Sequence, residues 1–436
     1  MSFLSMKFLL FLAAAVAGYY VIPKQLQWVW LLIFSYIFYL ASGPAAVVFI
    51  LTTTATTFLG GLWLEHTDRA LACALDRTLA RDPDRLRRPA NPQQPLSPDE
   101  KKALKARFKQ RKKWITALVL FVNFGILAAL KYRNFAADNI NLLFGTHFSS
   151  AKLLLPLGIS FYTFQSMGYL IDVYRGKYAP DRNPFRFALF VSFFPQILQG
   201  PIGRYDRLAS QLYGQKNFSL TRIERGLQLM LWGYFKKIVI ADRAAVVVSE
   251  VFGNYQSYGG ILVMAGVLCY SLQLYGDFSG GMDVIMGASE CFGISLDTNF
   301  KRPYFAQSIS DFWHRWHITL GTWMKDYVFY PFSLSKGMNK FGKFCKKHFG
   351  KHVSRVLPVC IANLLVFFLV GVWHGPAWKF IVYGLYNGII IAASNLFAPF
   401  YGEMARKLHI PVESRSWMVV RILRTFLLVN VSWYFD

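Results

Sequence analysis

A single histidine lies between two strongly apolar stretches, in the string G-V-W-H-G-P at 371–376. An ionisable side chain inside an apolar span is costly, so His374 is a candidate functional residue by default. Imidazole takes up and returns a proton near neutral pH, which suits a general base. The flanking glycines would let a substrate approach the backbone closely. On spacing alone, a histidine that only hydrogen-bonds at a helix break is an equally open interpretation.

A second candidate is the aromatic segment 308–330, which contains His314 and His317 three residues apart. On one continuous helix, both histidines would lie on the same side. A stripe at helical spacing would combine Trp313, Trp316, Leu320 and Trp323. Ser308 or Ser310 is expected to cap the helix. The segment is amphipathic and too short and polar to span comfortably, so we expect an interfacial or re-entrant helix that lines a cavity.

The two histidines of this segment could also bind zinc. A catalytic zinc site needs a third protein ligand, and the H-E-x-x-H pattern of such sites is absent from the sequence. We therefore predict no metal site and interpret the pair as part of a polar cavity wall.

Two aspartates, Asp277 and Asp283, flank a glycine pair in Y-G-D-F-S-G-G-M-D at 275–283. They could anchor a substrate hydroxyl, accept hydrogen bonds from an arginine, or cap a following helix. A purely structural polar network explains them equally well, since buried polar groups need partners wherever they occur.

The composition identifies the environment of these groups. The 436 residues are 54% hydrophobic and 17% aromatic, with only 16% charged, against about 25% charged in a typical soluble domain. This composition excludes a disordered chain and argues against a soluble globular protein. The net charge of +25 indicates either nucleic-acid binding or basic loops of a membrane protein, and the positive mean hydropathy of +0.32 favours the membrane.

Many apolar stretches approach the ~20 residues that a transmembrane helix needs. We therefore predict an all-α polytopic membrane protein with about 10–12 transmembrane helices. Glycine or proline interrupts several stretches, and such breaks are tolerated at membrane depth where they line a cavity. Short re-entrant or interfacial helices around a central tunnel or funnel are expected. The stretches are Phe8–Ile22, Trp28–Leu40, Ala45–Leu64, Trp114–Leu130, Leu153–Tyr174, Phe185–Ile197, Gly226–Phe252, Gly260–Tyr275, Val356–Trp373, Trp378–Phe397 and Trp417–Phe435.

Two basic stretches predict the orientation in the membrane. Residues 65–114 carry 14 Lys/Arg against 7 Asp/Glu, and we expect a polar loop that is helical from Pro98 to about Lys113. Residues 336–355 carry seven Lys/Arg and no acid. Both should be cytoplasmic by the positive-inside rule, which accounts for the charge without a nucleic-acid partner. We treat 1–436 as a single membrane domain.

Signatures of other protein classes are missing. The five scattered cysteines form no C-x-x-C pair, which indicates neither a disulfide scaffold nor a structural zinc site. The sequence has no P-loop, no G-x-S-x-G elbow and no clear dinucleotide fingerprint, which argues against an ATP-driven pump.

Ordered motifs over about residues 110–398 resemble the membrane-bound O-acyltransferase (MBOAT) superfamily. The chain is most similar to its bacterial branch, which includes the membrane subunit of alginate O-acetylation and the membrane transferase of teichoic-acid D-alanylation. The matching strings are P-L-G-I-S-F-Y-T-F-Q at 156–165, Y-L-I-D-V-Y-R-G at 169–176, F-F-P-Q-I-L-Q-G-P-I at 193–202, Y-G-D-F-S-G-G-M-D at 275–283, N-F-K-R-P-Y at 299–304, D-F-W-H-R-W-H-I-T-L at 311–320, D-Y-V-F-Y-P at 326–331 and G-V-W-H-G at 371–375.

The resemblance implies specific roles for several residues. The family's catalytic histidine maps onto His374, and its second histidine maps onto His317 as a supporting residue. No cofactor is expected to stay bound. The implied fold is a ring of helices around a tunnel, in which the acyl donor enters from the cytoplasm and the acceptor lies on the opposite side. Candidate tunnel-lining residues are Trp313, Trp316, Trp373, Asp277, Gln196 and Asn299.

The expected function is transfer of an acetyl group from cytoplasmic acetyl-CoA to hydroxyls of an extracytoplasmic polysaccharide. A secreted or membrane-anchored SGNH-type acyltransferase is the expected partner, and the cell (cytoplasmic/inner) membrane is the expected location. D-alanyl transfer from a carrier protein to teichoic acid is the alternative within the superfamily. A polysaccharide or small-molecule transporter with a histidine proton relay is the alternative of another class. Relatives usually continue from the N-V-S-W motif at 430–433 into further C-terminal helices, whereas this sequence stops at Asp436, so a native and a truncated C-terminus are both open alternatives.

Overall fold

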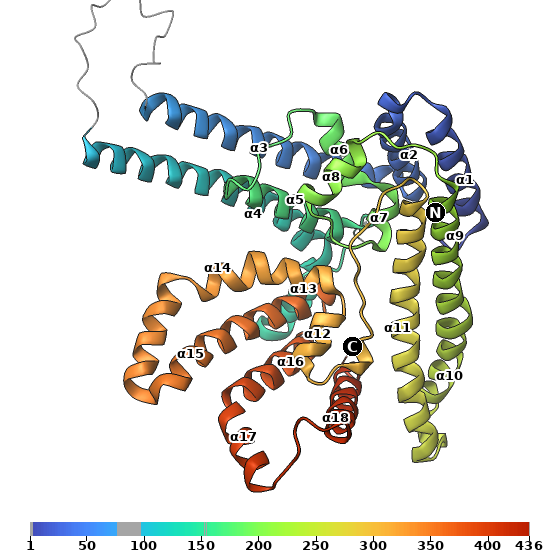
Figure 1. Ribbon diagram of the computed structural model, residues 1–436, viewed down its shortest axis with the longest axis vertical. Coiled ribbons are helices and arrows are strands. Elements are labelled where there is room, and N and C mark those ends of the chain that lie inside the picture. Colours follow the sequence, from blue (N-terminus) through green and yellow to red (C-terminus); the bar gives the residue numbers. More distant parts are fainter. Residues whose placement is uncertain (1–2, 76–96, 152, 154, 436) are drawn as a thin grey trace, which may run out of the picture.

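The computed structural model describes residues 3–75, 97–151, 153 and 155–435 of the chain. Every regular element in these ranges is helical, and none is a strand, which confirms the all-α prediction. In Figure 1 the N-terminal helices lie at the top and the C-terminal helices at the bottom, with an upright helix pair along one side.

In the described ranges, the N-terminal group contains eight α-helices. Two long ones, α3 and α4, lie side by side and project from the group (Figure 1). The helices are α1 (Met6–Val21), α2 (Gln27–Ser42), α3 (Val47–Leu75), α4 (Pro98–Phe144), α5 (Ile159–Tyr174), α6 (Pro184–Ser192), α7 (Phe194–Gln199) and α8 (Tyr205–Tyr213).

The upright pair is formed by a run of three helical segments packed on one long helix. The run comprises α9 (Leu220–Tyr234), a π-helical segment (Phe235–Ala241) and α10 (Asp242–Gly253), and its partner is α11 (Gly260–Glu290). A Cβ atom at Gly233 would lie 2.6 Å from the carbonyl oxygen of Gly280, so glycine is what lets α9 and α11 approach this closely.

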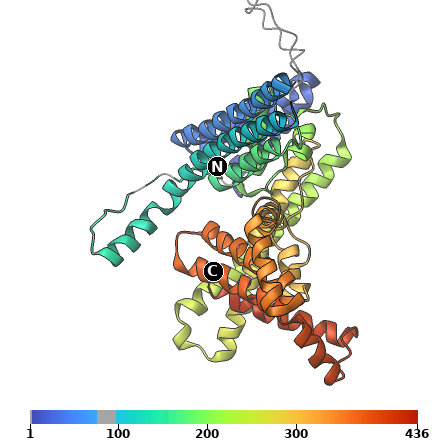
Figure 2. The same ribbon diagram turned by 90° about the vertical axis from the view of Figure 1, so that its left-hand side faces the viewer.

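The C-terminal group begins with two short helices and continues with a helical hairpin, α15–α16, seen at the bottom of Figure 1 and turned toward the viewer in Figure 2. Its helices are α12 (Ile309–Arg315), α13 (Ile318–Met324), a π-helical segment (Lys325–Phe329), α14 (Tyr330–Ser333), α15 (Lys336–His374), α16 (Trp378–Leu396), α17 (Ala398–Lys407) and α18 (Arg415–Trp433).

Four helices in the described ranges are long and apolar enough to cross a membrane, and a fifth span is possible if the bent pair α16–α17 counts as one. This supports a multi-pass membrane protein but falls short of the 10–12 spans expected. The reason is helix length: α1, α2 and α5 have 16 residues each, and the stretch predicted at 185–197 divides into α6 and α7. The four spans are Pro44–Leu75, Pro98–Phe144, Gly260–Glu290 and Lys336–His374.

The predicted polar loop at 65–114 is largely helical where the structure describes it. The helix start at Pro98 is confirmed, with a capping box in which Ser97 and Glu100 bond each other's backbone N–H. The helix does not end near Lys113 but continues to Phe144. An ion pair of 2.8 Å between Lys112 and Asp68 joins α4 to α3. Ala, Lys and Arg, which are frequent in this region, favour helix formation. The rest of the predicted loop, 76–96, lies outside the described residues.

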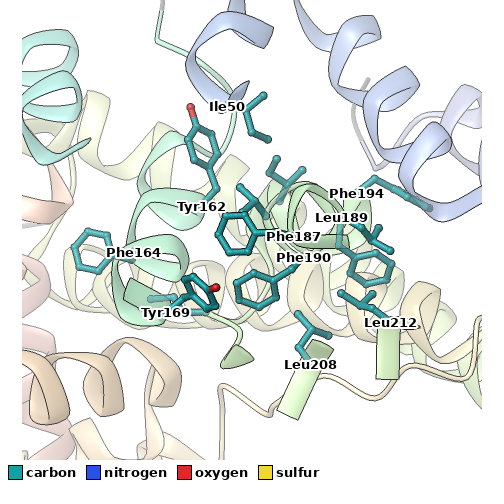
Figure 3. Close-up of a cluster of buried hydrophobic side chains, with 14 of the residues drawn as sticks. Ile50, Tyr162, Phe164, Tyr169, Phe187, Leu189, Phe190, Phe194, Leu208 and Leu212 are labelled. Atoms are coloured by element: carbon teal, nitrogen blue, oxygen red, sulfur yellow. The ribbon is translucent and has the colours of Figure 1, made fainter. Parts of the chain in front are cut away.

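An aromatic core fixes α5 against α6 and α8. Figure 3 shows Tyr169, Phe187 and Phe190 pointing toward one another. The ring centroids of Tyr169 and Phe187 are 4.6 Å apart, and those of Tyr169 and Tyr205 are 4.8 Å apart. The Tyr169 hydroxyl accepts a hydrogen bond from the backbone N–H of Asp181 at 2.9 Å, so this buried ring keeps a polar partner.

Gly158 starts α5 in the left-handed region, at φ +67°. A Cβ atom there would overlap the carbonyl oxygen of Ile197. Gly145, at the end of α4, has a similar φ of +63° but nothing within 4 Å of a Cβ. A side chain at Gly145 would therefore meet backbone strain alone, whereas a side chain at Gly158 would meet backbone strain and crowding together.

We expect Gly145→Ala to lower the free energy of unfolding by about 1–2 kcal/mol, the cost of a left-handed alanine. Gly158→Ala should cost clearly more, because the added methyl also displaces the Ile197 carbonyl. Thermal unfolding of both variants in detergent measures the difference, and equal losses would contradict the crowding at Gly158.

Candidate active site

His374 is the last residue of α15, at the turn of the α15–α16 hairpin. The break that follows it, at 375–377, confirms the predicted helix interruption. A Cβ atom at Gly371 would overlap the carbonyl oxygen of Phe380, and one at Gly384 would overlap that of Phe367. Glycines on both helices therefore allow α15 and α16 to pack at backbone contact around the histidine.

The expectation of one continuous helix over 308–330 is wrong. The chain leaves α12 at Trp316, adopts a left-handed conformation at His317 with φ +46°, and begins α13 at Ile318. A non-glycine residue at positive φ is strained, and surrounding contacts must hold it. Among the expected caps, Ser308 is confirmed, since its hydroxyl accepts a hydrogen bond from Asp311 N–H at 3.0 Å.

Asn299 supplies the contacts that hold this break. Its carbonyl oxygen accepts from Ile318 N–H at 3.1 Å, and its side-chain oxygen accepts from the N–H and hydroxyl of Thr319 at 2.9 and 2.7 Å. Tertiary hydrogen bonds thus replace helical ones and override the local helix pattern. Asn299 is buried in this role and is not part of the cavity wall.

His374 and His317 line one cavity of about 360 Å³. The indole ring of Trp373 contacts both imidazoles, with ring centroids 5.5 Å from His317 and 5.3 Å from His374. Trp313 and Trp316 also belong to the wall. The structure therefore brings five of the eight predicted site residues together. The wall is completed from distant parts of the chain by Lys131 of α4, Phe161 of α5, Phe278 of α11 and Trp433 of α18.

His317 is a buried histidine with available ring nitrogens. It is only 3% exposed, and neither ring nitrogen has a hydrogen-bond partner among the described residues. Burial, with a smaller contribution from His374, lowers its pKa from 6.5 to about 3. A neutral imidazole always carries one N–H and one acceptor nitrogen. Leaving such a group unpaired is costly, which is typical of a site that waits for a ligand.

A second cavity of about 360 Å³ shares Trp313 and His317 with the first. Residues of α12, α13, α15 and α16 line it, together with His314, which lies outside the wall of the first cavity. A third cavity, of about 610 Å³, shares Asp326 with the second. His317 and Trp313 thus lie between the first and second cavities, and Asp326 lies between the second and third.

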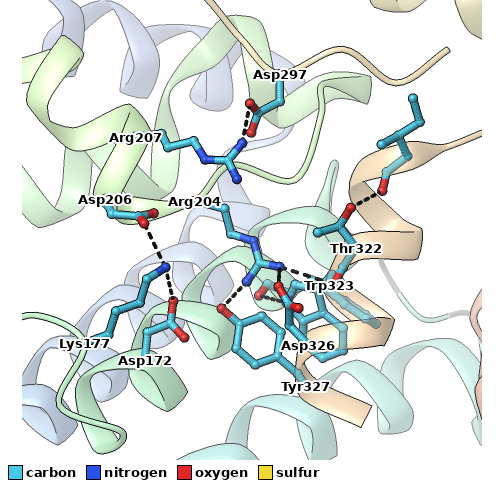
Figure 4. A network of polar contacts seen from close by, with 12 residues as sticks. Asp172, Lys177, Arg204, Asp206, Arg207, Asp297, Thr322, Trp323, Asp326 and Tyr327 are labelled. Atoms are coloured by element: carbon cyan, nitrogen blue, oxygen red, sulfur yellow. Dashed lines mark hydrogen bonds and ion pairs between the residues drawn. The ribbon is translucent and has the colours of Figure 1, made fainter. Parts of the chain in front are cut away.

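A polar cluster surrounds the third cavity and was not anticipated from the sequence (Figure 4). Arg204 lies 2.6 Å from the Asp326 carboxylate and also donates to the Tyr327 hydroxyl. Lys177 bridges Asp172 and Asp206, at 3.4 and 2.7 Å. The alternating charges of R-Y-D-R at 204–207, directly after an apolar stretch, are the sequence signal that could have indicated this cluster.

Two further predicted residues lie away from the described cavities. Gln196 is buried, and its amide donates to the side-chain oxygen of Gln165 at 2.9 Å and to the Pro201 carbonyl at 2.6 Å. Asp277 forms an ion pair with Lys237 of the π-helical segment, and its side chain is 44% exposed. Each of the two side chains joins neighbouring segments of the fold, and neither lines a described cavity, so their place in a tunnel wall stays a prediction.

Asp283, the other aspartate of the motif, pairs with Lys236 at 2.7 Å. Both aspartates of α11 thus face consecutive lysines of the π-helical segment, as the structural-network alternative predicts. Lys131 is the site residue that sequence reasoning missed. Its signal was a lone lysine directly after the apolar stretch 114–130. In the described residues, no group of three or more His, Cys, Asp or Glu side chains could hold one metal ion.

Several known proteins are similar to this chain. The chain is 35% identical over 331 residues to the probable alginate O-acetylase AlgI of Pseudomonas putida, covering 75% of this chain and 62% of the relative. It is 34% identical over 346 residues to the peptidoglycan O-acetyltransferase of Helicobacter pylori, covering 73% and 60%. It is 30% identical over 300 residues to the teichoic acid D-alanyltransferase of Bacillus subtilis, covering 66% and 70%.

The chain spans about three fifths of the length of the alginate and peptidoglycan relatives. The model of MBOAT, the membrane-bound O-acyltransferase family, matches residues 179–430, which is more than half of the chain and includes both histidines. The chain therefore belongs to the membrane-bound O-acyltransferase family.

Proposed function

We propose that this protein transfers an acetyl group from acetyl-CoA toward hydroxyls of an extracytoplasmic polysaccharide, with His374 as the general base. The observation that carries the proposal is the pair of cavities that meet at His317, because a donor and an acceptor arriving from opposite sides would meet beside the two histidines. Similarity to alginate and peptidoglycan O-acetylating relatives supports a carbohydrate acceptor.

The reaction needs no covalent enzyme intermediate, since a thioester carbonyl is already reactive. The acceptor hydroxyl gives its proton to the unprotonated ring nitrogen of His374 as its oxygen attacks the thioester carbonyl carbon. The new C–O bond forms and the carbonyl oxygen gains negative charge. When the C=O bond re-forms, the C–S bond breaks, and the departing thiolate takes the proton from the imidazolium. The products are an ester and a free thiol.

His317 is suited to a different part of this reaction. Its lowered pKa keeps the ring neutral near pH 7, so it serves as a hydrogen-bond donor rather than as a cation. We propose that its N–H binds the oxygen that becomes negative during attack. Fixed donors of this kind act strongly in a site from which water is excluded. The aromatic wall around the ring supports that exclusion.

The donor is proposed to enter from the cytoplasm. The third cavity is lined in part by Leu334, two residues before the basic stretch 336–355, whose charge predicts a cytoplasmic face. The acceptor would then reach the first cavity from the other side of the cell membrane. The proposed partner is an SGNH-type acyltransferase that completes the transfer to the polysaccharide, on the strength of the family resemblance alone.

The decisive experiment follows acetyl transfer from radiolabelled acetyl-CoA with the purified protein in lipid nanodiscs. We expect transfer by the wild type and a loss of about 10²–10⁴-fold in kcat for His374→Ala, the usual contribution of a general base. Turnover with a D-alanyl carrier protein but not with acetyl-CoA would show that the carrier protein, and not acetyl-CoA, is the acyl donor. Movement of an acceptor across the membrane without acyl turnover would overturn the enzyme assignment.

The lowered pKa of His317 predicts how the free energy of unfolding depends on pH. Between pH 6.5 and pH 3 the unfolded chain binds the His317 proton and the folded chain does not, so stability falls as pH falls. From pH 6.5 to 5.5 the wild type should lose about 1 kcal/mol more than His317→Gln, which lacks this proton. Unfolding in detergent at the two pH values measures it, and equal losses would show that His317 is not buried as a neutral ring.

The charge of the basic stretch 336–355 predicts an effect on the KM for the acyl donor. Lys343, Lys346 and Lys347 are exposed, and their charge would attract an anionic donor. Neutralising all three to Gln should raise the KM for the donor while kcat stays the same, and added salt should shrink the difference. The matched control replaces three exposed lysines at the start of α4, Lys101, Lys102 and Lys105. An unchanged donor KM in the first triple variant would refute electrostatic attraction by this stretch.

A further inference from the structure

The end of α15 is held from outside by helix α4. The last carbonyl groups of a helix have no partner within the helix. Here the ammonium of Lys131 donates to the carbonyl oxygen of Trp373, and the hydroxyl of Tyr132 donates to that of Val372. These two carbonyls belong to the residues directly before His374, so α4 forms hydrogen bonds with the backbone that carries the proposed base.

The same helix also holds the other side of the break. The indole N–H of Trp378, the first residue of α16, donates to the side-chain oxygen of Asn139 at 2.8 Å. The ring of Phe135 packs edge-on against Trp378 with centroids 5.8 Å apart. Lys131, Phe135 and Asn139 are four residues apart on α4, which places them on one helix face. That face spans the gap between α15 and α16.

A third contact joins α4 to the segment that follows it in the chain. The side chain of Asn134 exchanges two hydrogen bonds with the backbone of Ala151, at 2.9 and 3.0 Å. The chain beyond Ala151 leads to Pro156 and Gly158, which line the cavity of His374. The last turns of α4 therefore bind both sides of the α15–α16 break and the backbone of Ala151.

The choice of a lysine for this contact is unusual. A charged side chain within an apolar span is costly, and Lys131 forms no ion pair with a carboxylate in the described parts of the chain. Its charge is met instead by the negative end of the α15 dipole and by the Trp373 ring, whose centroid lies 5.8 Å away. Lys131 also lines the cavity itself. An ionisable side chain within an apolar span is therefore a candidate functional residue.

We propose that Lys131 and Tyr132 are positioning residues for His374. They bind the two carbonyls before it, fix the rotation of the end of α15, and so hold the imidazole toward the cavity. The inference rests on the proposed role of His374 as the base. It adds that the base is aimed by α4, a helix that is more than 200 residues away in the sequence.

Three variants and one control test this. Lys131→Met removes the donor but keeps the chain length, Tyr132→Phe removes one hydroxyl, and Lys131→Arg keeps a cationic donor. A misplacement of about 1 Å at a reacting group costs on the order of 10²-fold. We therefore expect the first two variants to lose about 10- to 100-fold in kcat with little change in donor KM, and Lys131→Arg to recover most of it. The control is Arg133→Met, an exposed residue of the same turn, which should match the wild type.

A double-mutant cycle with His374→Ala separates positioning from a general structural role. If Lys131 acts through the imidazole, Lys131→Met should cause no further loss once His374 is gone. The same fold loss in both backgrounds would overturn the proposal, as would normal kcat in both Lys131→Met and Tyr132→Phe. Full activity of His374→Ala would instead overturn the proposed function. Elution as a single peak in detergent confirms folding, and Tyr132→Phe tests the contact if Lys131→Met does not fold.

Discussion

The backbone groups freed at helix breaks are the constraint on which this structure depends. Water is scarce at membrane depth, so every N–H and C=O released by a break needs a partner from elsewhere in the protein. Both histidines of the cavity sit at such breaks. Asn299 satisfies the break at His317, and Lys131 with Tyr132 satisfies the break at His374. The polar contacts that satisfy the backbone groups at the two breaks are thus the same contacts that orient the two histidine rings.

Close packing between helices is the second feature that holds the site together. Glycines allow α15 to touch α16, and α9 to touch α11, at backbone distance. Where lysine and aspartate enter the α9–α11 pair, they meet as Lys236–Asp283 and Lys237–Asp277. The π-helical segment that carries both lysines presents consecutive residues to one neighbour, and such segments often mark sites under local constraint. Rigid packing on this side keeps Phe278 against His317, with ring centroids 4.9 Å apart.

The sequence predicted the features that depend on local chemistry. The break after His374 follows from G-P at 375–376, and the helical class follows from the apolar stretches. The break at His317 could not be predicted in this way, because the residues around it favour a helix and the competing hydrogen bonds come from Asn299, 18 residues earlier. The partners of Asp277 and Gln196, which are Lys237 and Gln165, could not be predicted for the same reason, since they are set by how the helices pack.

The number of spans was overestimated because apolar character does not determine helix length. Several apolar stretches form helices shorter than the ~20 residues of a typical span, and two of them, α5 and α6, pack against each other in the aromatic core near Tyr169. Lys131 was overlooked for a related reason. As a single charge after an apolar stretch, it looks like the end of a span, and only the tertiary structure places it in the cavity wall and against the Trp373 carbonyl.

The two histidines differ most in what surrounds them, and this difference suits a division of labour. His317 lies wholly buried, and its pKa of about 3 keeps it neutral and able to donate from one nitrogen. His374 lies at a helix end, beside carbonyls that carry the negative end of the helix dipole and are themselves bound by a lysine. Two titratable groups of one type, held in unlike environments, are a usual way to assign acid–base and hydrogen-bonding roles within one site. In the proposed reaction the ring at the helix end moves the proton, and the buried ring stabilises the charge that this transfer creates.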